Sequence, residues 1–485
     1  MTSLPSSFPR SLLFRASGSA LCVALAATFV ACSSTSTDSN PGSAGAPTAG
    51  AAAGLAGAAT AGSAGSSGGT VGGVAGGESS GGASAAAGSG GVNAGGASAT
   101  AGASGTGGAL NNHADDAAFC SGALDSAAKD YKGFIAAYTD LTKIPRSVKG
   151  STVRTVALGD WTIGFDAGSM WLLYEHSKDE AYRTAAEAWT NALYSQRLRT
   201  DDHDVGFIIM TSYGNGYRIT KNADYATVIK TAGQSLSTRF NAKVGATRSW
   251  DNAAWSFPVI IDNMMNLELL YRATELGGSP DLAADAKQHA LTTRTNHFRP
   301  DFSSYHLVDY NPSTGAVIKK QTVQGIADDS AWARGQAWGL YGFTMSYRES
   351  KEPKFLDQAL AIAEFYTKHA DFPTDNVPYF DFATVQRADI PDYRDASAGA
   401  IAAGGLLELA KYAAPEAAER YRAFAIKALR SLASPAYRAP AGSNGNFLLL
   451  HSLGNFPAND EIDVAINYAD YYYLEALSRC KALAN

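Results

Sequence analysis

Residues 397–409, SAGAIAAGGLLEL, and residues 415–432, PEAAERYRAFAIKALRSL, decide the fold of this chain. The first segment is apolar nearly all round, with Glu408 as its one charged residue, whereas the second carries its charged residues on one face of a helical pattern. A helix that is apolar all round must be surrounded by protein, while an amphipathic helix covers a neighbour from one side. The two segments therefore predict an inner helix packed against an outer helix.

The same alternation recurs along the chain, since Phe257–Tyr271 is apolar nearly all round and Tyr182–Leu198 carries charges on one face. Apolar residues at three- and four-residue spacing predict twelve helices with few strands. Six inner and six outer helices indicate an all-α (α/α)6 toroid, with its active cleft built by loops at one end of the ring. The predicted helices are 120–141, 161–176, 179–198, 204–218, 222–240, 257–276, 280–296, 329–349, 354–370, 396–413, 416–432 and 469–483.

The N-terminus has the features of a signal peptide, predicted over residues 1–31. Arg10 and Arg15 precede the apolar run 20–31, which is too short to cross a bilayer as a mature helix. The run ends in Phe-Val-Ala-Cys32, similar to the lipobox of bacterial lipoproteins, which predicts a lipidated Cys32. The alternative is an ordinary signal peptide with an incidental cysteine.

Residues 32–114 consist almost entirely of Gly, Ala, Ser and Thr, with no aromatic residue between Phe29 and Phe119. Such a segment cannot build a core and predicts a disordered tether. Residues 115–485 then form one domain. The expected protein is an exported bacterial lipoprotein, anchored to a membrane only by its lipid, in the periplasm or at the cell surface.

The remaining cysteines lie near the two ends of the domain. In a closed ring the first and last helices are neighbours, so Cys120 and Cys480 are expected to lie close and to be able to form a disulfide in an oxidising compartment. The alternative is two unpaired buried thiols. The formal net charge of −6 and the absence of basic clusters, paired zinc-ligand spacings and phosphate-binding glycine loops argue against nucleic acid. The sequence also lacks the spaced His and Asp ligands that would indicate a metal site near Asp204.

Residues 324–342, QGIADDSAWARGQAWGLYG, indicate a carbohydrate site. Trp332 and Trp338 offer rings that stack on sugars, and Arg334 and Gln324 offer donors for hydroxyl or carboxylate groups. Glycines let the backbone approach a ligand closely.

Hydrolysis of a sugar usually needs two carboxyl groups. Asp262 interrupts an apolar segment and is a candidate proton donor, with a helix cap as the structural alternative. Asp204 lies among Asp201, Asp202 and His203, where capping of the following helix is the simpler interpretation from spacing alone. The neighbouring Arg394 and Asp395 are most simply a salt bridge.

Seven motifs in order resemble glycoside hydrolase family 88, the unsaturated glucuronyl hydrolases. The resemblance covers residues 161–477. Its motifs are WTIGF at 161–165, HDVGF at 203–207, DNMMNL at 262–267, SYH at 304–306, the block 324–338, SAGAIAA at 397–403 and YADYYYLEAL at 468–477.

The resemblance implies an (α/α)6 toroid acting on oligosaccharides left by polysaccharide lyases, which carry a 4,5-unsaturated uronic acid at the non-reducing end. It implies that Asp262 is the general acid/base and Asp204 the second essential carboxylate, and that no cofactor or metal is required. The implied substrate-binding residues are His203, Trp250, His306, Gln324, Arg334, Trp338 and Trp161.

Three alternatives stay open at the level of the sequence. The first is an unsaturated rhamnogalacturonyl hydrolase that acts on pectin fragments, and the second is a catalytically inactive glycan-binding lipoprotein. The third is a conventional inverting hydrolase that uses the same two aspartates on saturated glycosides.

Overall fold

The computed structural model describes residues 106–484, with side chains from 113 to 483, all within one compact unit. The predicted signal peptide, Cys32 and nearly all of the predicted tether lie outside the described residues. Among the described residues, no helix has the length and apolar character needed to cross a membrane.

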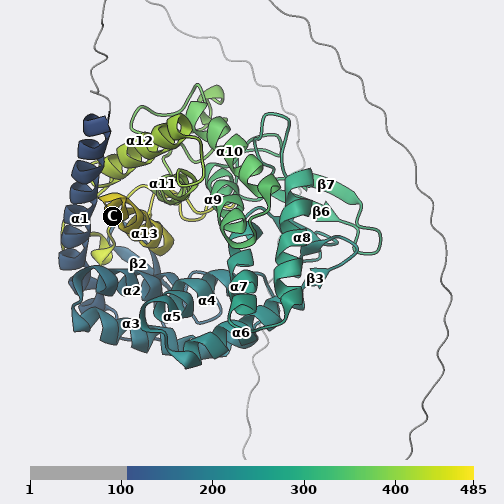
Figure 1. Cartoon of the computed structure of the whole chain (residues 1–485), viewed down its shortest axis with the longest axis horizontal. Helices are drawn as coiled ribbons and strands as arrows, with labels where there is room; N and C mark the ends of the chain where they lie inside the picture. The colour runs from purple at the N-terminus through teal and green to yellow at the C-terminus, as the bar shows by residue number, and fades with distance from the viewer. Residues whose placement is uncertain (1–105, 485) are drawn as a thin grey trace, which may run out of the picture. The chain divides into compact units, whose positions relative to one another are not determined.

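Six helical segments form an inner ring, and consecutive segments pack against one another until the last closes on the first (Figure 1). These are α2 (Phe165–Ser177), α4 (Val205–Ile209) continuing through the π-helical turn η2 (Met210–Gly214) into α5 (Asn215–Thr220), α7 (Asn263–Glu275), α9 (Ala333–Ser350), α11 (Ala396–Leu409) and α13 (Asn467–Lys481).

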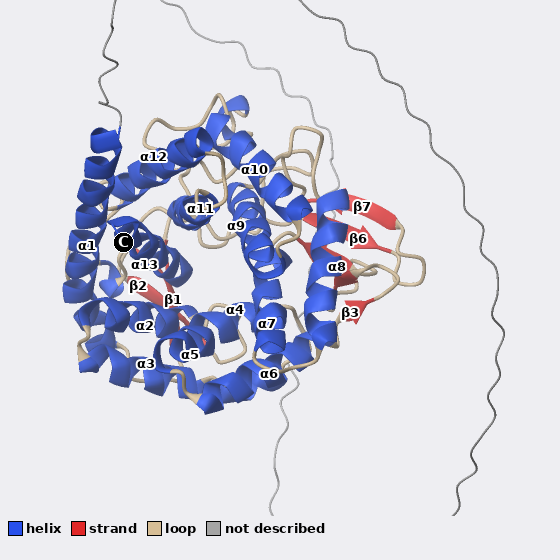
Figure 2. Ribbon diagram, in the orientation of Figure 1, coloured by secondary structure: helices blue, strands red, loops and turns tan. Residues whose placement is uncertain are grey.

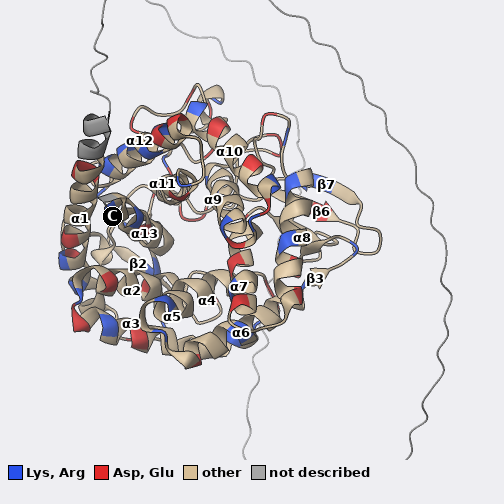
Figure 3. Cartoon of the chain, viewed as in Figure 1, with Lys and Arg blue, Asp and Glu red and all other residues tan. Residues whose placement is uncertain are grey.

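Six outer helices cover this ring, and Figure 3 shows charged residues on the outer helices α1, α3 and α12. The outer helices are α1 (Thr106–Ala137), α3 (Glu180–Ala192), α6 (Ala223–Ser237), α8 (Pro280–Asn296), α10 (Pro353–Lys368) and α12 (Pro415–Leu432). The predicted toroid of inner and outer helices is therefore confirmed. Short 3-10 turns are η1 (Tyr194–Leu198), η3 (Thr384–Gln386), η4 (Asn444–Asn446) and η5 (Ala482–Ala484).

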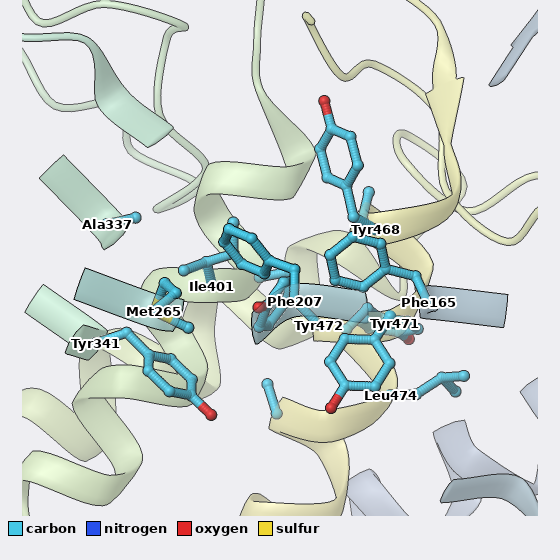
Figure 4. Packing of buried hydrophobic residues seen from close by; sticks show 14 of the residues in the cluster. Phe165, Phe207, Met265, Ala337, Tyr341, Ile401, Tyr468, Tyr471, Tyr472 and Leu474 are labelled. Carbon is cyan, nitrogen blue, oxygen red and sulfur yellow. The ribbon is translucent and has the colours of Figure 1, made fainter. Parts of the chain in front are cut away.

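The inside of the ring is filled with side chains from all six inner segments (Figure 4). Aromatic rings dominate this plug, in which Trp338 lies 5.1 Å from Phe207 and 5.2 Å from Tyr472 between ring centroids. Each of these rings is almost completely buried. The plug separates the two ends of the ring, so the polar side chains at one end do not contact those at the other.

The expectation of an all-α domain missed eight short strands, drawn red in Figure 2. They form sheets in the orders β2-β1-β8, β3-β4 and β5-β6-β7, with antiparallel pairing. The strands are β1 (Ile144–Lys149), β2 (Thr152–Val156), β3 (Phe240–Asn241), β4 (Ala246–Thr247), β5 (Pro258–Ile260), β6 (Leu307–Tyr310), β7 (Val317–Gln321) and β8 (Ala465–Ile466).

The helix predicted from 257 was wrong at its start, because residues 258–260 form β5 and α7 begins only at Asn263. A short apolar run has no periodicity that separates a buried strand from a buried helix. Helix α1 also begins at Thr106, so the last residues of the predicted tether are helical. Cys120 of α1 and Cys480 of α13 are joined by a disulfide with an S–S distance of 2.08 Å, which ties the first and last helices together.

Candidate active site

The six inner segments all begin at the same end of the ring, where the loops that precede them gather. Asp204 directly precedes α4, and Asp262 directly precedes α7. Neither carboxylate caps its own helix, and the backbone N–H of Asp204 donates to Asp202 Oδ1 instead, at 2.8 Å. The capping alternatives for Asp204 and Asp262 are therefore wrong, and both carboxylates are available for another role.

Asp204 and Asp262 are buried, with exposed fractions of 9% and 8%. No Lys or Arg nitrogen within the described region lies within 4.0 Å of either carboxylate. Burial, with a further contribution from the negative charge of Asp262, raises the pKa of Asp204 to about 7. Burial and the neighbouring charge of Asp262 therefore favour the protonated form of Asp204.

His306 directs a ring N–H toward Asp262. The backbone N–H groups of Val323 and Gln324 donate to His306 Nδ1, at 3.0 and 3.3 Å. A neutral imidazole that accepts at Nδ1 carries its proton on Nε2. His306 Nε2 lies 3.6 Å from Asp262 Oδ2, and neither atom has a hydrogen-bond partner. The strand β6 and the loop after β7 thus aim an unused donor at the space beside Asp262.

His203 is held in the same way beside Asp204. The side-chain Oδ1 of Asn266 accepts from the backbone N–H of Phe207 at 2.6 Å, which leaves its Nδ2 to donate to His203 Nδ1 at 3.3 Å. The proton of His203 is then on Nε2, 3.4 Å from Asp204 Oδ1. Burial lowers the pKa of His203 to about 4, so its imidazole is neutral. Each aspartate therefore has one neutral histidine with Nε2–H facing it.

Gly206 allows α4 and α7 to pack closely against each other. A Cβ at this position would lie 2.5 Å from Asn266 Oδ1 and 2.6 Å from its Cα. Any side chain there would separate α4 from α7 and move the two aspartates apart. Asn266, one helical turn after Asp262, is a positioning residue that the sequence analysis did not identify, although the four-residue spacing was visible.

Two of the predicted substrate-binding tryptophans border the carboxylates and are only half-buried. Trp250 lies 6.3 Å from His203, and the ring of Trp161 lies 5.5 Å from Phe207, in the residues just after Asp204. Both rings extend from loops at the site end of the toroid. Of the three predicted substrate-binding tryptophans, Trp161 and Trp250 have ring surface exposed to a ligand, whereas Trp338 is buried.

Gln324 and Arg334 hold a loop in the structure. Gln324 Nε2 donates to the carbonyl oxygen of Gly454 at 3.0 Å, and Arg334 Nη2 donates to the same oxygen at 2.7 Å. Arg334 Nη1 donates to the carbonyl oxygen of Leu453 and to Asp395 Oδ2, at 2.5 and 2.7 Å. Arg334 is 1% exposed, and its guanidinium also lies over the ring of Trp332. Both residues thus fix the loop around Gly454 at the site.

The predicted salt bridge between Arg394 and Asp395 was wrong. Asp395 pairs with Arg334 and accepts from the backbone N–H groups of Ser397 and Ala398, so it caps α11. Arg394 instead pairs with Asp375 at 2.9 Å. Neighbours in sequence point to different sides here because the chain is extended at Asp395.

Trp338 is completely buried between Phe207 and Tyr472 in the aromatic plug. Its role as a stacking surface for a sugar stays a prediction, and in the structure it supports Phe207 beneath the carboxylates. Trp332, which packs 4.7 Å from His306, was not identified as a supporting residue by the sequence analysis. Among the described residues, no cluster of three His, Cys, Asp or Glu side chains is arranged to hold a metal ion.

Residues 138–455 match the Glycosyl Hydrolase Family 88, which is well over half of the chain. The chain belongs to this family. A relative from Formosa agariphila, an unsaturated glucuronyl hydrolase, is 45% identical over 340 residues, which cover 69% of this chain and 84% of the relative.

Solved structures of unsaturated glucuronyl hydrolases agree with this assignment. A crystal structure of an unsaturated glucuronyl hydrolase specific for heparin has a TM-score of 0.72 and 44% identity, and covers 74% of this chain and 96% of that one. A mutant unsaturated glucuronyl hydrolase from Streptococcus agalactiae, complexed with dGlcA-GalNAc6S, has a TM-score of 0.61 and 27% identity, with coverages of 73% and 90%. The chain is therefore a glycoside hydrolase.

Proposed function

We propose that this family 88 hydrolase removes the 4,5-unsaturated uronic acid from the non-reducing end of lyase-generated oligosaccharides, in the degradation of glycosaminoglycan-type polysaccharides. The observation that carries the proposal is the pair Asp204 and Asp262, buried without a cationic partner and faced by two neutral histidines. The heparin-specific relative and the relative bound to dGlcA-GalNAc6S support the substrate class.

In this proposal Asp262 is the general acid and base. It donates its proton to C4 of the C4=C5 double bond, which places positive charge on C5 and the ring oxygen. As a carboxylate it then removes a proton from a water molecule that attacks C5. The product is a hemiketal, which opens and releases the rest of the glycan.

Asp204 stabilises the positive charge that develops at C5 and orients the sugar. It lies close enough to Asp262 for the negative charge of Asp262 to raise the pKa of Asp204. The Nε2–H of His306 faces the carboxylate that forms on Asp262 after proton transfer. Each histidine thus supplies an N–H donor that can stabilise the carboxylate it faces, His203 for Asp204 and His306 for Asp262.

The polarity of the ring suits an anionic sugar. All six inner segments direct their N-terminal ends, with their positive partial charge, toward the site. The carboxylate of a uronate is favoured there over a neutral group. The remaining residues proposed to contact the substrate, directly or through the loop at Gly454, are His203, Trp250, His306, Gln324, Arg334, Trp338 and Trp161.

The test is loss of the ultraviolet absorbance of the conjugated C4=C5 uronate when the purified protein is mixed with disaccharides made by lyases from chondroitin, heparin and pectin. We expect decay on chondroitin or heparin disaccharides, and none with Asp262→Asn. Decay only on the pectin fragment identifies an unsaturated rhamnogalacturonyl hydrolase. Cleavage of saturated glycosides identifies an inverting hydrolase, and binding without turnover identifies a glycan receptor.

We also propose that the chain is an exported bacterial lipoprotein, with cleavage before Cys32, residues 32–105 as its tether and a periplasmic or cell-surface location. The disulfide between Cys120 and Cys480 supports an oxidising compartment. Expression in a bacterial host with labelled palmitate tests this. The wild type should carry the label in the membrane fraction, and Cys32→Ser should be unlabelled. Label on both variants would refute the anchor.

A further inference from the structure

The outer helix α8 contributes a buried histidine that is bonded toward the active site. His289 belongs to α8, which packs against α7 (Figure 1), and its side chain is fully buried. Its ring Nδ1 accepts a hydrogen bond from the backbone N–H of Thr247 in β4, at 2.9 Å. His289 thus joins an outer helix to the strand that precedes the loop of Trp250.

Thr247 connects His289 to the first residue of α7. The carbonyl oxygen of Thr247 accepts from Asn263 Nδ2 at 2.8 Å, while its N–H is bound by His289. Asn263 directly follows Asp262 and is also fully buried. Both backbone polar groups of Thr247 are therefore held by side chains, one from α8 and one from α7.

The carboxamide oxygen of Asn263 faces His203. Burial lowers the pKa of His203 to about 4, and the Asn263 side chain opposes this shift as a hydrogen-bonding group. Nδ1 of His203 is occupied by Asn266, whereas His203 Nε2 and Asn263 Oδ1 have no other hydrogen-bond partner. An oxygen near Nε2 favours the tautomer that carries its proton there. Asn263 therefore supports the same tautomer of His203 as Asn266 does.

Polar side chains fill the space among β4, α7 and α8. Burying polar groups costs folding free energy that apolar side chains of similar volume avoid. A polar cluster retained behind the carboxylates is therefore better explained by the site than by stability. Its members are at most 1% exposed and are Thr247, Asn263, His289 and Thr293.

We propose that His289 is a positioning residue for His203 and Asp204, acting through Thr247 and Asn263. The inference rests on the proposed function, in which Asp204 works as a carboxylate. His289 orients the Thr247 backbone, Thr247 orients Asn263, and Asn263 holds His203 with Nε2 3.4 Å from Asp204 Oδ1. An N–H that faces a carboxylate favours its ionised form. Loss of His289 therefore makes ionised Asp204 less stable.

His289 does not itself titrate in the working range of the enzyme. Burial lowers its pKa to about 3, with smaller contributions from His297 and His203. A substitution at His289 leaves the other charged groups of the site in place, so a shift of the pH profile reports the orientation of His203. The charged groups that act on His203 are Asp202, Asp262 and Arg239, and those that act on Asp204 are Asp262, Arg199 and Asp160.

The experiment compares His289→Phe with His289→Asn, whose side-chain oxygen can take the place of Nδ1 as acceptor. The matched control is Gln358→Leu, which removes a buried polar side chain from another outer helix, α10. We expect His289→Phe to lower kcat/KM on lyase-made disaccharides about tenfold. The acidic limb of its pH profile should move up by about half a pH unit. His289→Asn should restore both in part, and Gln358→Leu should change neither.

Circular dichroism at each pH corrects the rates for any loss of folded protein. An acidic limb that stays in place in His289→Phe after this correction overturns the proposal, even if kcat/KM falls. A wild type without turnover refutes the proposed function instead.

In that case the nitrogen NMR signals of the His203 ring, assigned by their loss in His203→Gln, decide the positioning role. They should show the proton on Nε2 in the wild type and in Gln358→Leu, and a mixture of the two tautomers in His289→Phe. Identical signals in all three proteins would overturn the proposal.

Discussion

Buried acidic residues lie at both ends of the inner ring, but they differ in whether an arginine neutralises them. At the site end, Asp204 has no cationic partner, and burial together with the charge of Asp262 raises its pKa to about 7. At the other end, Glu408 in the last turn of α11 bonds Arg348 and Arg479 at 2.9 Å each. Burial raises the pKa of Glu408, but the two arginines outweigh it and the net pKa is lowered.

The unpaired carboxyl suits a chemical role, whereas the paired carboxylate contributes to the stability of the fold. An unpaired buried carboxyl costs folding free energy but retains a proton for chemistry. A paired carboxylate is satisfied and chemically inert, and here it joins α9, α11 and α13 through their C-terminal turns. The aromatic plug between the two ends keeps these environments apart (Figure 4).

The largest expected effect is on catalysis at the site end. Asp262→Asn removes the proposed proton donor and should lower kcat/KM by about 10³-fold, on the order of 4 kcal/mol in transition-state stabilisation. The thermal midpoint should change little, since Asp262 has no ionic partner to lose. Absorbance decay and thermal denaturation measure the two effects. Activity within tenfold of the wild type would contradict the assignment of Asp262.

At the end of the ring that contains Glu408, we expect a loss of stability with little change in activity. Glu408→Gln leaves Arg348 and Arg479 partly unpaired and should lower the free energy of unfolding by about 3 kcal/mol, with KM unchanged. Urea denaturation measures the change. The matched control is Glu419→Gln, an exposed acid paired with Arg422, where less than about 0.5 kcal/mol is expected. Equal losses of unfolding free energy in the two variants would contradict a stabilising role for Glu408.

Asp204→Asn should increase stability while it lowers activity. Because the folded-state pKa of Asp204 is raised to about 7, the folded protein holds a proton that the unfolded chain releases between about pH 4 and 7. Stability is therefore lost as pH rises through this window. The variant should be more stable than the wild type by about 4 kcal/mol at pH 8 and similar to it at pH 4. Denaturation at both pH values tests the sign, and a wild type that gains stability over this range relative to the variant would refute it.

The smallest effect expected is at Asn266, which orients His203. Asn266→Ala should lower kcat/KM about tenfold, because His203 loses the donor that places its proton on Nε2. The control is Asn215→Ala, which removes another buried amide, bonded to the Thr211 carbonyl oxygen and to Tyr471. Both variants should lose about 1 kcal/mol of stability. Only Asn266→Ala should alter the pH profile of kcat/KM, and an equal change in both would show that Asn266 is merely structural.

The helices were the most predictable part of the fold. Each of the twelve predicted helices corresponds to a segment of the ring, because a buried or half-buried helix leaves a three- to four-residue pattern in its own sequence. The strands were missed because β5 has only three residues and β6 pairs with it across more than forty intervening positions. Such pairing leaves no local signal.

Residue types at the site were also predictable, whereas their partners were not. Asp204 stands out in an acidic cluster before an apolar helix, and Asp262 as an acid within an apolar segment. The sequence did not indicate that Asn266 orients His203, that Arg334 bonds Asp395 sixty-one positions away, or that Trp338 is buried beneath Phe207. Each of these contacts depends on how neighbouring inner helices pack.

The order of residues along the chain thus determined the helices and their inner or outer position, because periodicity and burial act over a few residues. The roles predicted for Asp204 and Asp262 came from the family motifs and not from their spacing. Tertiary structure decided which nitrogen of each histidine carries a proton, which arginine neutralises which carboxylate and which carboxylates stay unpaired. These properties arise only when the ring closes, since closure brings together residues as far apart in sequence as Cys120 and Cys480.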